Sequence, residues 1–210
     1  AEMGEDYWGA LFDGIKKRNI RIGIYNEFFQ MPSGEFIDRM ADTVIREHSP
    51  VAISPLSGNE RVRRLNGKHY SNEQFFDMLE RLNRHKIFIF VYFSLNLPGE
   101  TRETYEETLE LARAVYEFYP SPQLKILNTV HTIDPLSPMN IAPEKYGVKS
   151  VMKTFKDYYN YCYNTGLNGA EARVGEHRGF DLSAEGRRSL EEMAKAWDNL
   201  RTGREKSWWP

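Results

Sequence analysis

Apolar and polar positions follow one another along the chain in strand-then-helix units, most clearly from Ile87 to Thr101. Every residue from Ile87 to Phe93 is apolar or aromatic, which is typical of a strand buried on both faces. The run ends at Ser94, and the chain turns at Pro98-Gly99. Thr101 is then a good N-cap for a helix. That helix is expected to bury one stripe, formed by Leu109, Ala112, Val115 and Phe118.

Comparable units precede and follow this one. Strands are expected at Ile20–Tyr25, at Val51–Ile53 and, after the unit above, at Leu124–Ile133. A helix is expected at 7–17, with Trp8, Leu11, Phe12 and Ile15 inward, and another is capped by Ser33 and runs to about Glu47. A short helix at 60–65 precedes one capped by Ser71 or Asn72, with Phe75, Phe76, Leu79 and Leu82 inward. The units recur at about 30 to 35 residues. This periodicity predicts an α/β fold, a parallel sheet or partial (βα) barrel of about four strands.

The pattern changes after Met139. Asn140–Gly147 is expected to be a loop, Val148–Asn164 a helix rich in tyrosine, and Thr165–Asp181 a glycine-rich segment with few apolar anchors. A charged helix is expected from Ser183 to about Leu200. We therefore divide the chain into a partial barrel, 1–139, and a helical C-terminal appendage, 140–210. The Trp208-Trp209-Pro210 tail is expected to make a docking contact.

Composition excludes several classes of function. The 210 residues carry a formal net charge of −2, so no basic excess indicates nucleic-acid binding. No apolar run approaches the roughly 20 residues of a membrane span, and the first 30 residues lack a signal pattern. The cytoplasm is the expected location. The single cysteine, Cys162, excludes an internal disulfide and a multi-thiolate metal site built by this chain.

Candidate chemistry lies in the loops that follow the strands, where barrels of βα units bind ligands. Polar residues follow three of the expected strands: Ser54, Ser57, Asn59 and Glu60, then Ser94 and Asn96, then Thr132 and Asp134. Such groups suit the ribose and amino-acid parts of a small ligand. Glu60 could bind ribose hydroxyls, and Lys68 or Arg61 a carboxylate. Turn chemistry and helix capping would equally explain Ser57-Gly58 and Thr101.

Three segments resemble one family of enzymes. These are SPLSGNERVRRLNGKHYSNEQ, NLPGETRETYEET and IDPLSPM, in that order, within residues 10–165. They resemble the later half of radical S-adenosylmethionine (SAM) enzymes, in particular iron–sulfur oxidoreductases with an N-terminal cobalamin-binding domain, such as the magnesium-protoporphyrin ester cyclases. The matching residues are Ser57, Gly58, Glu60, Arg61 and Lys68, then Leu97–Thr101, then Ser137-Pro138. The resemblance implies that Ile87–Phe93 is the fifth barrel strand and that Ser94 and Asn96 face the cofactor.

The resemblance also implies cofactors: SAM, a [4Fe–4S] cluster and, in the cobalamin-dependent members, cobalamin. The family cleaves SAM reductively at its cluster and uses the 5′-deoxyadenosyl radical. The cluster-binding CxxxCxxC loop of the family is absent from this sequence, as are its first two βα units. Asn96 stands where the family has glycine, which predicts a loss of backbone freedom. Pro135-Leu136 stands where Pro-Gly is usual.

We therefore expect a C-terminal fragment of a larger radical SAM protein, inactive alone and binding no cofactor by itself. Its expected partners are the missing N-terminal half and a small-molecule substrate, with no nucleic acid and no membrane. Two alternatives stay open: a stand-alone, non-catalytic binding or scaffolding subunit, and a lyase or aldolase-like barrel with Lys68 or Lys125 as nucleophile. Exposed sheet edges would also favour self-association.

Overall fold

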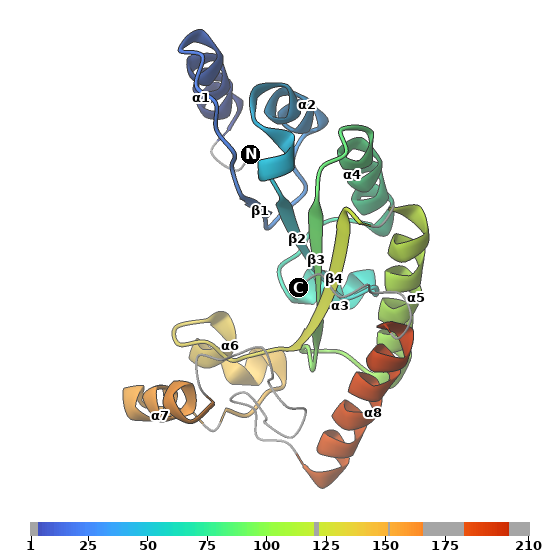
Figure 1. The fold of residues 1–210 in the computed structure, drawn as a ribbon. Coiled ribbons are helices and arrows are strands. Elements are labelled where there is room, and N and C mark those ends of the chain that lie inside the picture. The colour runs from blue at the N-terminus through green and yellow to red at the C-terminus, as the bar shows by residue number, and fades with distance from the viewer. Residues whose placement is uncertain (1–3, 120–121, 151, 166–182, 202–210) are drawn as a thin grey trace.

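A four-stranded parallel sheet organises the protein (Figure 1). The computed structural model describes residues 4–119, 122–150, 152–165 and 183–201, without the side chains of 161–165. The strands are β1 (Asn26–Phe28), β2 (Val51–Leu56), β3 (Ile89–Leu95) and β4 (Leu124–Val130). They lie in the order β1-β2-β3-β4, and every neighbouring pair is parallel. This order is that of a barrel segment and confirms the predicted partial (βα) barrel.

Helices connect the strands and cover the sheet. They are α1 (Glu5–Lys17), α2 (Gly34–Thr43), η1 (Arg46–His48), α3 (Glu60–Leu65), α4 (Asn72–Arg84), α5 (Arg102–Phe118), α6 (Pro138–Ile141), η2 (Pro143–Tyr146), α7 (Phe155–Thr165) and α8 (Ala184–Arg201). The hydroxyls of Ser33, Ser71 and Thr101 cap α2, α4 and α5, as the sequence predicts. Reciprocal capping boxes at Ser71 and Thr101 fix where the two longest connecting helices begin.

The two faces of the sheet differ in burial. Ile89, Val91 and Phe93 of β3 are fully buried against the helices. The alternate positions, Phe90 and Tyr92, are only half-buried because they point to the opposite face. Figure 1 shows α4, α5 and α8 on one side of the strands, with α6 and α7 beyond the ends of β3 and β4. We call the face that carries Phe90 and Tyr92 the inner face.

The first strand differs from its prediction. Ile20–Tyr25 forms no strand, and only Asn26–Phe28 pairs with β2. The backbone of the 20–25 segment is bound elsewhere, because the Ile45 N–H donates to the Ile22 carbonyl and the Ile24 N–H donates to Ser49 Oγ. These bonds tie the segment to the turn after α2.

Several predicted boundaries and burial assignments also change. The helix after Ser33 ends at Thr43 rather than near Glu47, and 140–147 contains α6 and η2 instead of a loop. The tyrosine-rich helix begins at Phe155 rather than at Val148. Leu11 and Phe118, expected inward, are 46% and 40% exposed.

Helix α8 belongs to the same hydrophobic core as the sheet. Its Leu190, Trp197 and Leu200 are buried in that core, and the Trp197 ring lies 5.6 Å from the ring of Phe93 on β3. It runs beside α5 (Figure 1), so it takes the place of the helix that follows β4. Residues 131–183 are therefore one long βα connection. The division at residue 139 stays a prediction, and the 208–210 tail lies outside the described residues.

Candidate functional site

The loop between β2 and α3 is fixed against α5. The Ser57 hydroxyl lies 3.2 Å from the Thr108 hydroxyl, and the Gly58 N–H donates to Thr108 Oγ1 at 2.9 Å. Asn59 caps α3 through the Val62 N–H and also donates to Glu107 Oε1 at 2.8 Å. Ser57 is fully buried among these contacts. Its side chain holds the loop on α5, and its predicted contact with a ligand stays a prediction.

Arg63 on α3 is the largest fully buried side chain of the described residues. Its guanidinium donates twice to the Ser57 carbonyl, through Nε at 3.1 Å and Nη2 at 2.8 Å, and once to the Tyr70 carbonyl at 3.2 Å. It also donates to Asn72 Oδ1 and lies 5.1 Å from the centre of the Tyr70 ring. Burial lowers the pKa of this guanidinium. Arg63 therefore joins the loop after β2 to the start of α4.

The other charged candidates of this region lie around the same loop. Glu60 Oε1 accepts from the Asn72 N–H at 2.8 Å, and Glu60 Oε2 faces Arg64 at 3.4 Å. The Arg61 guanidinium makes a long, 3.5 Å contact with the Gly99 carbonyl in the loop after β3. Lys68 is buried, and its ammonium lies 4.8 Å from the centre of the Phe29 ring. The predicted ribose and carboxylate contacts of these residues remain predictions.

The loop after β3 is held by a buried carboxylate. Glu100 Oε2 accepts from the Asn96 N–H at 2.8 Å and from the Leu97 N–H at 3.3 Å. Asn96 has a φ of 62°, in the left-handed region that asparagine tolerates better than most residues. Asn96 therefore adopts the left-handed conformation that glycine would also permit at this position. Gly99, with a φ of 77°, completes the turn.

This loop also carries polar atoms with no partner. Burial raises the pKa of Glu100 from 4.5 to about 7, against the lowering effect of its two backbone hydrogen bonds. Among the described residues, neither Glu100 Oε1 nor Asn96 Nδ2 has a hydrogen-bond partner, although both atoms are buried. Ser94, two residues before Asn96, is buried, and its position two residues after Tyr92 on β3 places it on the inner face. Buried polar atoms left in this way suit a polar ligand.

The raised pKa of Glu100 predicts a pH-dependent stability. The folded chain binds this proton more tightly than the unfolded chain does, so its contribution is full below about pH 4.5 and is lost as pH rises through about 7. The free energy of unfolding should therefore fall between pH 5 and 8, by at most about 3 kcal/mol at about 1.4 kcal/mol per unit. Urea unfolding followed by circular dichroism measures it.

Glu100→Gln should remove this part of the pH dependence, because the amide keeps an acceptor oxygen and does not titrate. Glu110→Gln, on the exposed face of α5, is the matched control. Equal pH profiles for wild type and Glu100→Gln would contradict the assignment.

The inner face itself carries a carboxylate, phenols and an amine. Glu27, Ala52, Phe90 and Lys125 form one row across the four strands. Burial is the largest cause that raises the pKa of Tyr92, and the Glu27 carboxylate adds to it. The pKa of the neighbouring Tyr25 is also raised, mainly by burial and then by Tyr92 and Glu27. Glu27, Tyr25 and Tyr92 are near enough to interact electrostatically on an open, half-polar surface.

Comparison with protein families identifies the fold. The family model of the radical SAM superfamily matches residues 6–112, about half of the chain. The chain belongs to the radical SAM superfamily. No curated protein matches the chain. The matched residues include β1, β2, β3 and both loops described above, whereas β4 and everything after it lie outside the match.

The superfamily implies SAM and a [4Fe–4S] cluster, and the two fit this chain differently. One cysteine cannot supply the several thiolates that such a cluster needs. Among the described residues, no group of three or more His, Cys, Asp or Glu could hold a metal ion. The unpartnered polar atoms of Asn96 and Glu100, in contrast, fit the polar groups of SAM. No helix of the described residues is long and apolar enough to cross a membrane.

Sequence reasoning named some of the residues in these loops. It placed Ser94 and Asn96 at the end of β3, and both lie there. It did not identify Glu100, because a single carboxylate in a turn gives no sequence signal of its own. It did not identify Arg63 either, because a helix with several arginines resembles one exposed to solvent. It also named Lys125, which is half-buried in the row with Glu27.

Proposed function

We propose that this chain is the C-terminal part of a radical SAM barrel and forms one wall of the SAM and substrate cavity. The observation that carries the proposal is the open inner face of a four-stranded parallel sheet, with unpartnered polar atoms at the end of β3. Ligands of parallel α/β folds bind beyond the carboxyl ends of the strands, where these atoms lie. The chain alone is expected to be catalytically inactive.

The missing N-terminal half of the barrel is the proposed occupant of the inner face. Phe90 and Tyr92 on β3 are half-buried and stacked 6.4 Å apart, and Phe88 lies 4.9 Å from Phe90. A ladder of aromatic side chains of this kind loses contact with water when a barrel closes over it. The cluster cysteines would come from that missing half, so no step of the reaction is assigned to residues of this chain.

The candidate residues then divide by role. Ser94 and Asn96 are proposed to contact SAM directly. Ser94 lies on the inner face, and the Asn96 side-chain amide has no partner among the described residues. Glu60, Arg61 and Lys68 are proposed to form the neighbouring rim, and Ser57 to position it through Thr108. The proposal that the whole enzyme uses cobalamin is supported only by the three segments that resemble the cobalamin-dependent enzymes.

A second candidate function is a non-catalytic binding or scaffolding subunit derived from such a barrel. The same open face favours it, because the outer edges of the described sheet and the aromatic rings of Phe88, Phe90 and Tyr92 also suit self-association. The length of the native reading frame separates the two proposals: a frame that encodes a CxxxCxxC upstream supports the first, and a frame limited to this chain supports the second.

Anaerobic reconstitution with iron and sulfide tests the proposal that the cluster is bound by the other half of the barrel and not by this chain. We expect no visible cluster absorbance and an iron content equal to that of a Cys162→Ala variant, because one thiolate cannot hold a [4Fe–4S] cluster. A stoichiometric cluster in the wild-type chain that is lost in Cys162→Ala would contradict the proposal.

The cavity wall is tested by combining the chain with the proposed N-terminal half, adding SAM and recording amide chemical shifts. We expect perturbations at Ser94 and Asn96, with none at Thr108, which is buried on the helix-covered side. Perturbations confined to α5 or α8, or none at saturating SAM, would contradict the placement of the cavity.

A further inference from the structure

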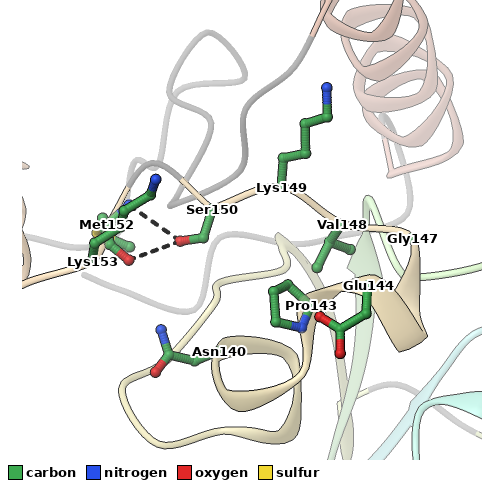
Figure 2. Close-up of a pocket in the computed structure, with 9 residues that line it drawn as sticks. All are labelled: Asn140, Pro143, Glu144, Gly147, Val148, Lys149, Ser150, Met152 and Lys153. Atoms are coloured by element: carbon green, nitrogen blue, oxygen red, sulfur yellow. Dashed lines mark hydrogen bonds between the residues drawn. The ribbon is translucent and has the colours of Figure 1, made fainter.

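The connection between β4 and α8 encloses a cleft outside the region that matches the family (Figure 2). Its volume is about 780 Å³, within the range of small-molecule sites. The connection runs from 131 to 183, whereas βα loops usually have about 2 to 6 residues. Part of this extra length forms α6, η2 and α7. The lining residues are Asn140, Pro143, Glu144, Gly147, Val148, Lys149, Ser150, Met152 and Lys153.

One part of the lining is apolar. Met152 is buried, and Pro143 and Val148 are half-buried. Figure 2 shows Pro143 and Val148 close together beneath the segment that carries Lys149 and Ser150. Pro143 and Val148 form a surface on which the apolar body of a ligand can pack, and Met152 lines the cleft farther along.

The uncharged polar groups of the lining are already satisfied. Asn140 Nδ2 donates to the Tyr158 hydroxyl at 2.8 Å, and Asn140 Oδ1 accepts from the Leu136 N–H at 3.3 Å. The Ser150 hydroxyl accepts from the Met152 N–H and donates to the Met152 carbonyl. These bonds shape the cleft and leave the polar recognition of a ligand to its charged side chains.

The charged lining is positive in balance. It contains two lysines, Lys149 and Lys153, and one carboxylate, Glu144. Within the described part of the chain no salt bridge is formed by either lysine. Asp157 is an acidic neighbour of Lys153, but its Oδ2 accepts from the Lys153 and Thr154 N–H groups and from the Thr154 hydroxyl. Both lysines are exposed, and Figure 2 shows Lys149 extending away from Pro143 and Val148. Because lysine has a long, flexible side chain, both ammonium groups can turn toward an anion held in the cleft.

We propose that this cleft binds a small organic acid, with its apolar body on Pro143, Val148 and Met152 and its anionic group at Lys149 and Lys153. The interpretation of that acid as the substrate of the barrel rests on the function proposed above. Binding itself does not, since it needs neither SAM nor a cluster.

Three probes of similar size and different charge test the proposal on the full chain. They are 4-phenylbutyrate, 4-phenylbutyramide and 4-phenylbutylamine, titrated while the amide and methionine-methyl shifts of 148–153 are recorded. We expect the carboxylate to bind about tenfold more tightly than the amide, because two charge-assisted contacts are added. The amine should bind most weakly.

Paired variants separate the cleft from general charge effects. Lys149→Ala with Lys153→Ala should weaken carboxylate binding about tenfold and leave amide binding unchanged. Lys16→Ala with Lys17→Ala, at the end of α1, removes the same charge elsewhere and should change neither affinity. Glu144→Gln should strengthen carboxylate binding.

Three outcomes would overturn the inference: equal affinities for the carboxylate and the amine, equal losses in the two lysine pairs, or shifts centred on Phe90 and Tyr92. None of them bears on the cluster and SAM experiments, so this inference and the proposed function can fail separately.

Discussion

Arg63→Ala is expected to destabilise the fold by about 3 to 5 kcal/mol, the range for a buried charged group whose partners are left behind. The substitution strips donors from the carbonyls of Ser57 and Tyr70 and from the Asn72 side chain. Each acceptor is part-buried or buried, so water does not replace the lost bonds at no cost. It also leaves a cavity where the largest fully buried side chain was.

Urea unfolding followed by circular dichroism measures the effect. Arg63→Lys keeps the charge but offers no planar fork, so it should recover only a minor part of the stability. Arg64→Ala is the matched control, because this neighbouring side chain is 56% exposed and pairs with Glu60 at 3.4 Å. It should change the free energy of unfolding by less than about 1 kcal/mol. Equal losses for Arg63→Ala and Arg64→Ala would contradict the structural role of Arg63.

Arg63 also shows where sequence reasoning stops. A helix of six residues with three arginines reads as solvated, and nothing in that pattern says which guanidinium turns inward. Burial of Arg63 depends on two carbonyls and an amide that the folded loops bring together. Such acceptors come from backbone conformation and leave no mark on the side-chain pattern.

The elements that could be predicted were those with local signals. Thr101 and Ser71 start their helices because a hydroxyl reaches an N–H three residues on, which depends on neighbours alone. The buried run at β3 was equally local. The strand expected at Ile20–Tyr25 was wrong although the sequence does alternate between apolar and polar residues there. Its N–H and carbonyl groups bind the turn at 45–49 instead of pairing with β2.

The candidate site divides in the same way. Ser94 and Asn96 were predictable because they end an apolar run, and parallel strands place such ends at one edge of the sheet. Glu100 was not predictable, since its role depends on a left-handed Asn96 that turns two N–H groups toward one carboxylate. The docking of α8 on β3 through Trp197 was also hidden, because no local signal in the residues between β4 and α8 indicates the surface on which α8 packs.

Gly58→Ala is expected to destabilise the fold by about 2 to 4 kcal/mol, at the upper end for overpacking. A Cβ at this position would lie 2.1 Å from the Glu107 carbonyl oxygen and 2.7 Å from Thr108 Cα, both of them backbone atoms of α5. The requirement is one of space, because the loop after β2 approaches the helix backbone closely enough for the Gly58 N–H to reach Thr108 Oγ1. Either the loop or the helix must move to admit the methyl group.

Gly14→Ala provides the same chemical change without that contact. Its Cβ would meet only the end of the Arg18 side chain, at 3.2 Å, and alanine in a helix is favoured over glycine by about 1 kcal/mol. Gly14→Ala should therefore be neutral or stabilising in the urea experiment in which Gly58→Ala is strongly destabilising. If the loop moves instead of the helix, Ser57 moves with it, and the Ser57 carbonyl loses its two bonds from Arg63. The double variant Gly58→Ala with Arg63→Ala then costs less than the sum of the two single losses, because both act on one contact. Strict additivity would show that the loop contact with α5 and the Arg63 network are independent.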